Sequence, residues 1–366
     1  MTVPGQPRTS EAARPQTPAA EDTWAVDSTP DAESMAGDSR RRMPDFFIVG
    51  HPKCGTTALH EMLRQHPQIH MPLKEPRFFA QELRSRFRRL GPETLPLTPE
   101  QYMALFDGAS PGQLLGEASP QYLRSQAVAE RIARVDPDAR IIAVLREPAS
   151  FLRSFHLQAL HNLNETETDF AKALALEPAR REGRKIPLYS QSPQALMYSE
   201  HVRYVEQLRR FHEAFPAEQV LVLIYDDFRR DNGAVLRQVL RFLGVDETVA
   251  IEPVQTSQLP AVRSPRLYAL TRALGIVKQK AKRGRRAAAA RGAGAAPRVG
   301  GPAPGRLAGP RRALALAWRR VLFAPQAPVD QALMAELRVR FKGEVEALSE
   351  YLGRDLVREW GYDELG

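Results

Sequence analysis

A short apolar run, a glycine-rich loop and a helical pattern, in that order, constrain this chain more than any other stretch. Residues 45–50, DFFIVG, are apolar and end in glycine, as in a strand buried on both faces. In the stretch TTALHEMLRQHP that begins at Thr56, Leu59, Met62 and Leu63 share one helical face, and a proline follows the helix. This order predicts a loop that binds a phosphate at the start of a helix.

The loop GHPKCGTT (50–57) differs from the nucleotide-binding pattern G-x-x-x-x-G-K-[ST] at one position. Thr56 replaces the lysine, Thr57 takes the hydroxyl position, and Lys53 lies inside the loop. The N–H groups of residues 53–57 would form a positively polarised concavity for a phosphate. The alternative is a turn that only starts the helix. In either case Lys53 is not placed to bind an NTPase γ-phosphate.

Apolar strand patterns alternate with helical patterns along the chain. Strands are predicted over 68–72, 114–119, 140–147 and 219–227, and helices over 195–215 and 233–244. This alternation predicts an α/β fold of the P-loop nucleotide-binding type, a three-layer sandwich around a mostly parallel central sheet.

Two segments are expected to lie outside the core. Residues 1–44 are polar and proline-rich without apolar periodicity, which predicts a disordered tail. Residues 278–312 form a basic low-complexity linker of Ala, Gly, Pro and Arg. We therefore predict the α/β domain over 45–277 and C-terminal helices, packed on that domain, within 313–366. Their apolar stripe consists of Leu337, Phe341, Val345, Leu348 and Leu352.

The positive charge of the chain is concentrated in one segment. The net charge is +9, and the 16 Lys and Arg between Ala261 and Val329, with no Asp or Glu, leave −7 for the rest. This distribution does not favour nucleic acid as a partner of the fold. The segment is either a solvated linker or an electrostatic patch for anionic lipid or an acidic partner.

Cysteine usage and hydropathy predict the compartment. Cys54 is the single cysteine, so an intrachain disulfide is excluded and a reducing compartment is favoured. Neither a signal peptide nor an 18-residue apolar run is found. A soluble, cytoplasmic protein is expected. The high usage of Ala, Arg and Pro is typical of a GC-rich bacterium.

A second motif, VLREPASFLRS (144–154), carries another candidate anion site. Arg146 ends an apolar strand, Pro148 opens a helix, and Ser154 follows two turns later. Side chains at strand ends of α/β folds gather around ligands, and a guanidinium matches phosphate oxygens. Arg146 and Ser154 can therefore converge on one phosphate. The alternative for Arg146 is a surface ion pair.

Together the two motifs resemble the sulfotransferase family that uses 3′-phosphoadenylyl sulfate (PAPS). The loop FIVGHPKCGTTAL resembles its 5′-phosphosulfate loop, and LREPASFLRS its 3′-phosphate motif. KEPRFF (74–79), GEASPQYL (116–123) and the stretch 198–229 also match, so the resemblance runs from about residue 45 to 245. The most similar branch acts on carbohydrate and small-molecule hydroxyls and includes the heparan sulfotransferases and many bacterial enzymes.

The resemblance implies a role for each motif residue. Lys53 would stabilise the leaving oxygen, the loop would hold the 5′-phosphate and the sulfate, and Arg146 and Ser154 would hold the 3′-phosphate. No metal is implied. The residues assigned to the donor are Lys53, Cys54, Gly55, Thr56, Thr57, Arg146 and Ser154.

The acceptor hydroxyl needs a general base. Glu75 matches the glutamate base of the heparan branch, with Lys74 beside it to tune its pKa. His70 and His51 remain alternatives, because aryl sulfotransferases use a histidine, and Glu75 could instead only pair with its basic neighbours. Glu117 would face the acceptor or support the site. The next residue is Ala118, where family members often carry a lysine, so the role of that lysine is not transferred to this chain.

Three further features leave alternatives open. VLVLIYDDF ends near Asp226 like a Mg²⁺-binding strand of an ATP-dependent kinase, although a structural aspartate is favoured. Cys54 fills the loop or acts as a reactive thiol. Arg263 and Arg266 are candidates for a nucleotide contact. Beside a sulfotransferase, the sequence thus admits a kinase or a non-catalytic nucleotide-binding scaffold. Neither the acceptor nor the oligomeric state is specified.

Overall fold

The computed structural model describes residues 43–72, 74–83, 96, 98–188, 190, 192–254, 260–271, 321–324, 326 and 328–364. The predicted tail, apart from residues 43 and 44, lies outside the described residues. So do the predicted linker over 278–312 and most of the basic segment 261–329.

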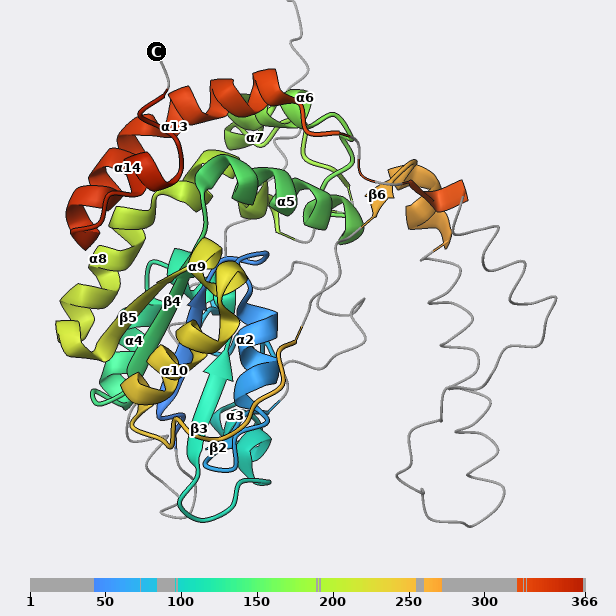
Figure 1. Cartoon of the computed structure of the whole chain (residues 1–366). Coiled ribbons are helices and arrows are strands. Elements are labelled where there is room, and N and C mark those ends of the chain that lie inside the picture. The colour runs from blue at the N-terminus through green and yellow to red at the C-terminus, as the bar shows by residue number, and fades with distance from the viewer. Residues whose placement is uncertain are drawn as a thin grey trace, which may run out of the picture.

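Five strands form one parallel sheet in the order β2-β3-β1-β4-β5 (Figure 1). The strands are β1 (Phe46–Gly50), β2 (Ile69–His70), β3 (Leu114–Ala118), β4 (Arg140–Leu145) and β5 (Val220–Ile224). The four apolar residues that open β1 are fully buried, as the apolar run predicts. The predicted α/β class is confirmed. Because all strands are parallel, their carboxyl ends meet at one edge of the sheet, where ligands of such folds bind.

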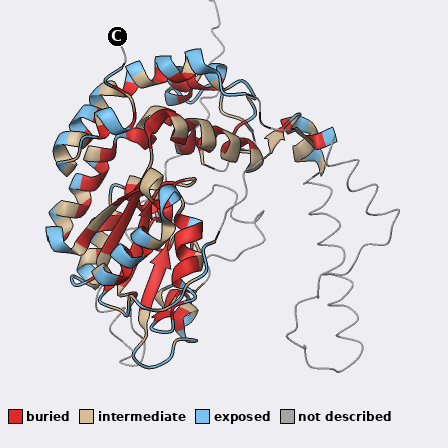
Figure 2. Cartoon of the chain, viewed as in Figure 1, coloured by how far each residue is buried: buried red, intermediate tan, exposed pale blue. Residues whose placement is uncertain are grey.

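Helices cover the sheet, and Figure 2 shows the buried strands enclosed by helices with exposed outer faces. The helices are α2 (Thr56–Leu63), α3 (Pro99–Met103), α4 (Val128–Val135), α5 (Pro148–His161), α6 (Phe170–Ala175), α7 (Glu177–Arg181), α8 (Tyr204–Ala214), α9 (Tyr225–Arg230), α10 (Asn232–Leu243), α13 (Gln331–Leu352) and α14 (Leu356–Glu359). A separate antiparallel pair joins β6 (Ala261–Val262) to β7 (Phe323–Ala324). Among the described helices, none has the length and apolar character needed to cross a membrane.

Two predicted elements were wrong in their extent. The strand predicted over 219–227 ends at Ile224, and α9 begins at the next residue. The helix predicted over 195–215 consists of two 3-10 turns, Pro193–Leu196 and Tyr198–Val202, followed by α8. Burial explains the second difference, because Tyr198 is fully buried and hydrogen-bonded within the core. Tertiary packing there overrides a regular helical period.

The C-terminal helix α13 arches over α5 and also contacts α8 (Figure 1). Leu337, Phe341, Val345 and Leu348 of its predicted stripe are buried, whereas Leu352 is half-buried. Beyond this helix, the Tyr362 hydroxyl donates to Glu147 Oε1 over 2.6 Å. The C-terminal segment thereby reaches the first turn of α5.

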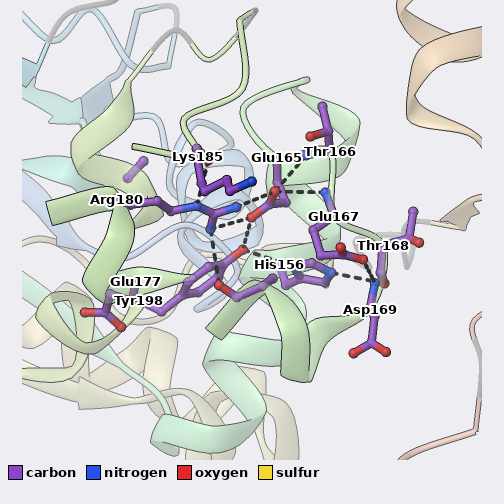
Figure 3. A network of polar contacts seen from close by, with 12 residues as sticks. His156, Glu165, Thr166, Glu167, Thr168, Asp169, Glu177, Arg180, Lys185 and Tyr198 are labelled. Carbon is purple, nitrogen blue, oxygen red and sulfur yellow. Dashed lines mark hydrogen bonds and ion pairs between the residues drawn. The ribbon is translucent and has the colours of Figure 1, made fainter. Parts of the chain in front are cut away.

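A buried polar network attaches α7 and the 3-10 turn Tyr198–Val202 to α5 (Figure 3). The Arg180 guanidinium makes two contacts of 2.8 Å with the Glu165 carboxylate, and both side chains are at most 1% exposed. Tyr198 donates to the same carboxylate over 3.2 Å and lies 2.9 Å from Nδ1 of His156 on α5. The network therefore fixes α7 and the turn at Tyr198 against the helix that carries Ser154.

Candidate active site

The loop between β1 and α2 is tightly constrained by its neighbours. Gly50 has a φ of 138°, and a Cβ atom there would lie 2.5 Å from the Val144 carbonyl oxygen of β4. Gly55 precedes α2 with a φ of 86°, and a Cβ atom there would lie 3.1 Å from the Tyr225 ring. Both glycines are therefore required by close approach as well as by backbone conformation. The first amides of α2 have no partner inside the helix and can bind an anion.

Lys53 is held in an unusual conformation within this loop. Its φ of 73° lies in the left-handed region, which non-glycine residues rarely occupy. Burial and the neighbouring Arg146 guanidinium lower the pKa of its half-buried ammonium group. Backbone strain of this kind persists where the surrounding structure enforces it, as at functional sites.

The second motif contacts the loop directly. Arg146 Nη1 donates to the Lys53 carbonyl oxygen over 3.0 Å, and its guanidinium stacks 4.7 Å from the centroid of the Tyr225 ring. The Tyr204 hydroxyl donates to the Arg146 carbonyl oxygen over 2.8 Å. Two motifs that the sequence separates by about 90 residues thus share one site at the carboxyl edge of the sheet.

Helix α5 starts immediately beside Arg146. The Glu147 carboxylate caps it by accepting from the N–H groups of Ala149 (3.0 Å) and Ser150 (2.7 Å). Ser154 is half-buried on the second turn, roughly 9 Å along the helix from its first residue at 1.5 Å per residue. Ser154 therefore lies near the middle of α5, whereas Arg146 precedes the helix.

Residues 74–77 approach the same loop from the edge of β3. Lys74 Nζ lies 2.9 Å from Thr57 Oγ1, 3.4 Å from Thr56 Oγ1 and 3.3 Å from Glu75 Oε1. The Glu75 N–H group donates to the Ala118 carbonyl oxygen over 2.8 Å. This backbone bond fixes the predicted base next to the predicted phosphate loop.

The charge of Glu75 is set by its two basic neighbours. Burial would raise the pKa of its carboxyl group, but the cations of Arg77 and Lys74 outweigh burial, and the net shift is downward. Arg77 pairs with one carboxylate oxygen and Lys74 with the other. Glu75 is therefore ionised at neutral pH. An ionised carboxylate is in the charge state that a general base requires.

The two candidate histidines lie in different surroundings. His51 is buried and in contact with Gln207 (Nε2–Oε1 2.8 Å), and burial lowers its pKa to about 3. His70 pairs with Leu115 of β3, three residues before Ala118, which is roughly 10 Å along the strand. Glu75 shares the Lys74 ammonium group with the hydroxyls of Thr56 and Thr57 at the start of α2.

Cys54 is fully buried, and burial raises the pKa of its thiol to about 12. The thiol therefore stays protonated at neutral pH, although it lies at a helix N-terminus. Because the thiolate is the nucleophilic form, this environment favours the interpretation of Cys54 as a residue that fills the loop.

Glu117 is the penultimate residue of β3, next to Ala118, whose carbonyl oxygen accepts from the Glu75 N–H group. It is buried and accepts hydrogen bonds from the hydroxyls of Tyr102 (2.6 Å) and Tyr122 (3.2 Å). Burial raises its pKa to about 7. Because its neighbour Ala118 holds the Glu75 backbone, Glu117 supports the site from inside the core.

Replacing Glu117 with glutamine should change how stability depends on pH. The folded-state pKa of about 7 exceeds the ordinary value of 4.5, so folding favours the protonated form. The stability that this proton contributes is present at acidic pH and is lost as the pH rises from 4.5 to about 7. Urea unfolding at several pH values should therefore show that the free energy of unfolding of Glu117→Gln rises relative to that of the wild type between pH 4.5 and about 7. Glu130→Gln, at an exposed position of α4, is the control. If the stability of both variants depended on pH in the same way, the raised pKa of Glu117 would be contradicted.

The remaining candidate residues are Asp226, Arg263 and Arg266. Asp226 and Arg263 make structural contacts, and the segment that carries Arg263 and Arg266 lies away from the phosphate loop. Asp226 Oδ2 accepts from Trp360 Nε1 over 3.2 Å, which attaches the C-terminal segment to the end of β5. Arg263 bonds to the Phe323 carbonyl oxygen, and Arg266 is exposed nearby. Their segment contacts the last residue of α5, roughly 20 Å along the helix from its first turn. Within the described part of the chain, no three potential metal ligands among His, Cys, Asp and Glu gather at one point.

Several residues of the site escaped the sequence motifs. Tyr204 and Tyr225 fix Arg146, and Tyr362 supports the cap of α5. A tyrosine carries no local signal for such a contact, because its partner is far away in the sequence. The sequence pointed to Lys74 only because it is next to Glu75. It did not predict the contacts of Lys74 with the hydroxyls of Thr56 and Thr57.

Comparisons with known proteins agree with this geometry. The profile described as "Sulfotransferase family" matches residues 44–248. Heparan sulfate glucosamine 3-O-sulfotransferase 3B1 of Mus musculus is 25% identical over 259 residues, which cover 69% of this chain and 60% of the relative. Heparan sulfate glucosamine 3-O-sulfotransferase 5 of Homo sapiens is 27% identical over 213 residues, covering 57% of this chain and 56% of the relative.

A solved structure shares the fold. The sulfotransferase from Alicyclobacillus acidocaldarius superimposes with a TM-score of 0.52 at 31% identity, covering 59% of this chain and 87% of that chain. The first curated relatives are longer than the matched region, and the chain spans 51 to 60% of their length. The matched region contains the loop, the 74–77 segment, β4 and the start of α5.

Proposed function

This chain belongs to the sulfotransferase family, and we propose that it transfers the sulfuryl group of PAPS to a hydroxyl group of a carbohydrate-containing or small-molecule acceptor. The observation that carries the proposal is the direct contact of Arg146 with the Lys53 carbonyl oxygen. It joins a phosphate loop to the strand end that would bind a 3′-phosphate. A donor with phosphates at both its 5′ and 3′ positions fits this pair of motifs.

Two of the groups proposed to hold the donor, the Arg146 guanidinium and the backbone of Lys53, are in direct contact. The amides of residues 53–57 and the hydroxyls of Thr56 and Thr57 would bind the 5′-phosphate and the sulfate. Arg146 and Ser154 would bind the 3′-phosphate. Lys53 would lie at the bridging oxygen, where negative charge develops as adenosine 3′,5′-bisphosphate (PAP) departs.

The acceptor would approach from the side of Glu75. In the reaction, the acceptor hydroxyl gives its proton to the Glu75 carboxylate as its oxygen attacks sulfur. The new S–O bond forms in line with the one that breaks, and PAP leaves with the bridging oxygen and the electron pair of the broken S–O bond. The named activity of the curated relatives, 3-O-sulfation of a glucosamine in heparan sulfate, favours a glycan hydroxyl as acceptor.

A nucleotide panel tests the proposal without knowledge of the acceptor. Melting temperatures would be measured with PAP, ADP and ATP, each with and without Mg²⁺. PAP should stabilise the protein most, by about 2.7 kcal/mol at 100 times its Kd. The shift should not need Mg²⁺, because protein groups would hold both phosphates. Equal shifts from all three nucleotides would contradict the 3′-phosphate site, and a shift by ATP that needs Mg²⁺ would favour the kinase alternative.

A further inference from the structure

The ammonium group of Lys74 lies between the two halves of the site. On one side it contacts the hydroxyls of Thr57 (2.9 Å) and Thr56 (3.4 Å) at the start of α2. On the other side it lies 3.3 Å from Glu75 Oε1. The side chain is only 17% exposed, so it is packed into the site and does not extend into solvent. A group transferred from the phosphate loop to an acceptor at Glu75 would therefore lie beside this ammonium group.

We infer that Lys74 is a second catalytic cation, which binds the non-bridging oxygens of the sulfuryl group during transfer. This inference rests on the proposed function. Lys53 would neutralise the charge on the leaving oxygen, whereas Lys74 would hold the group that moves. An ammonium group has three donors, and the long contact to Thr56 is the one that a sulfuryl oxygen can replace with least loss.

The contacts argue against a role for Lys74 through Glu75 alone. Arg77 already pairs with the other oxygen of the Glu75 carboxylate and lies first among the cations that lower its pKa. The ammonium group of Lys74 also lies closer to the Thr57 hydroxyl (2.9 Å) than to the Glu75 carboxylate (3.3 Å). Burial lowers the pKa of the Lys74 ammonium, and Glu75 opposes that shift, so the cation is stabilised by the carboxylate it faces.

A comparison of PAPS with PAP isolates the sulfuryl group, because the two ligands differ only in that group. In Lys74→Met, the Kd for PAPS should rise by about tenfold or more while the Kd for PAP changes by less than about threefold. Lys74→Arg, which keeps the charge, should recover part of the difference. Lys172→Met, at a 73% exposed position of α6, should behave as the wild type. Melting temperatures of all variants show whether each is folded.

Acceptor-free hydrolysis of PAPS gives a second readout. If Lys74 binds the sulfuryl group, Lys74→Met should slow the release of sulfate by about 10²-fold, and by a similar factor in a Glu75→Gln background. If Lys74 acts only through Glu75, the double variant should lose nothing beyond Glu75→Gln.

The outcomes separate this inference from the proposed function. Equal losses of PAPS and PAP affinity in Lys74→Met, or no further loss in the double variant, would overturn the role of Lys74. Should the wild-type protein bind neither PAP nor PAPS, the proposed function itself would fail. A folded Lys74→Arg variant with the wild-type ratio of PAPS to PAP affinity supports a charge contact to the sulfuryl group.

Discussion

Replacing Lys53 with methionine should slow the hydrolysis of PAPS by roughly 10²- to 10³-fold, the usual effect of removing one group that stabilises developing transition-state charge. Methionine has an unbranched side chain of similar length and the same backbone preferences, so the loop should keep its shape. The contact from Arg146 goes to the Lys53 carbonyl oxygen, which the substitution does not remove. PAP should therefore still bind, and the loss should be in kcat.

The structure offers a matched control for this variant. Lys185 also has a left-handed backbone, with a φ of 55°, but its side chain is exposed on the loop after α7. Lys185→Met thus makes the same change at the same kind of backbone position outside the site. It should hydrolyse PAPS at the wild-type rate. A loss of PAP affinity as large as the loss of rate in Lys53→Met would show that Lys53 acts in binding rather than in transfer.

The sequence was most informative where function and local structure coincide. The stretch from β1 to α2 predicted both a buried strand and a phosphate-binding turn, because glycine spacing and helical period are local patterns. Arg146 at the end of β4 was predictable for the same reason. The contact of Arg146 with Lys53 follows from the parallel pairing of β1 with β4, in which Gly50 lies opposite Val144.

The parts that could not be predicted depend on distant contacts. Glu75 and Arg77 have left-handed backbones, with φ values of 65° and 53°, although neither is glycine. This conformation is supported by the bond from Glu75 N–H to the Ala118 carbonyl oxygen and by the bond from Arg77 N–H to Ser119 Oγ (3.1 Å). Pairings between residues more than forty positions apart leave no periodic trace in the sequence. The buried pair of Arg180 and Glu165, fifteen positions apart, leaves no periodic trace either.

Arg180→Met should lower the free energy of unfolding by about 3–5 kcal/mol, because it leaves the Glu165 carboxylate buried without its cation. Glu165 is fully buried, and its remaining donors are neutral groups: the N–H groups of residues 166 and 167 and the Tyr198 hydroxyl. Urea unfolding gives the measurement. Arg184, on the loop after α7, is 64% exposed and pairs with Glu182, which is 62% exposed, so Arg184→Met should cost about 0–1 kcal/mol.

A double variant separates the buried charge from the lost packing. Glu165→Gln in the Arg180→Met background removes the uncompensated carboxylate and should recover much of the stability. If the single variants at 180 and 184 are equally stable, the Arg180–Glu165 pair does not hold α7 and the turn at Tyr198 in place. The network also reaches α5 through His156, two residues from Ser154. Arg180→Met should therefore weaken PAP binding as well, and Arg184→Met should not. Loss of stability without loss of PAP affinity would confine the network to the fold and separate it from the 3′-phosphate site.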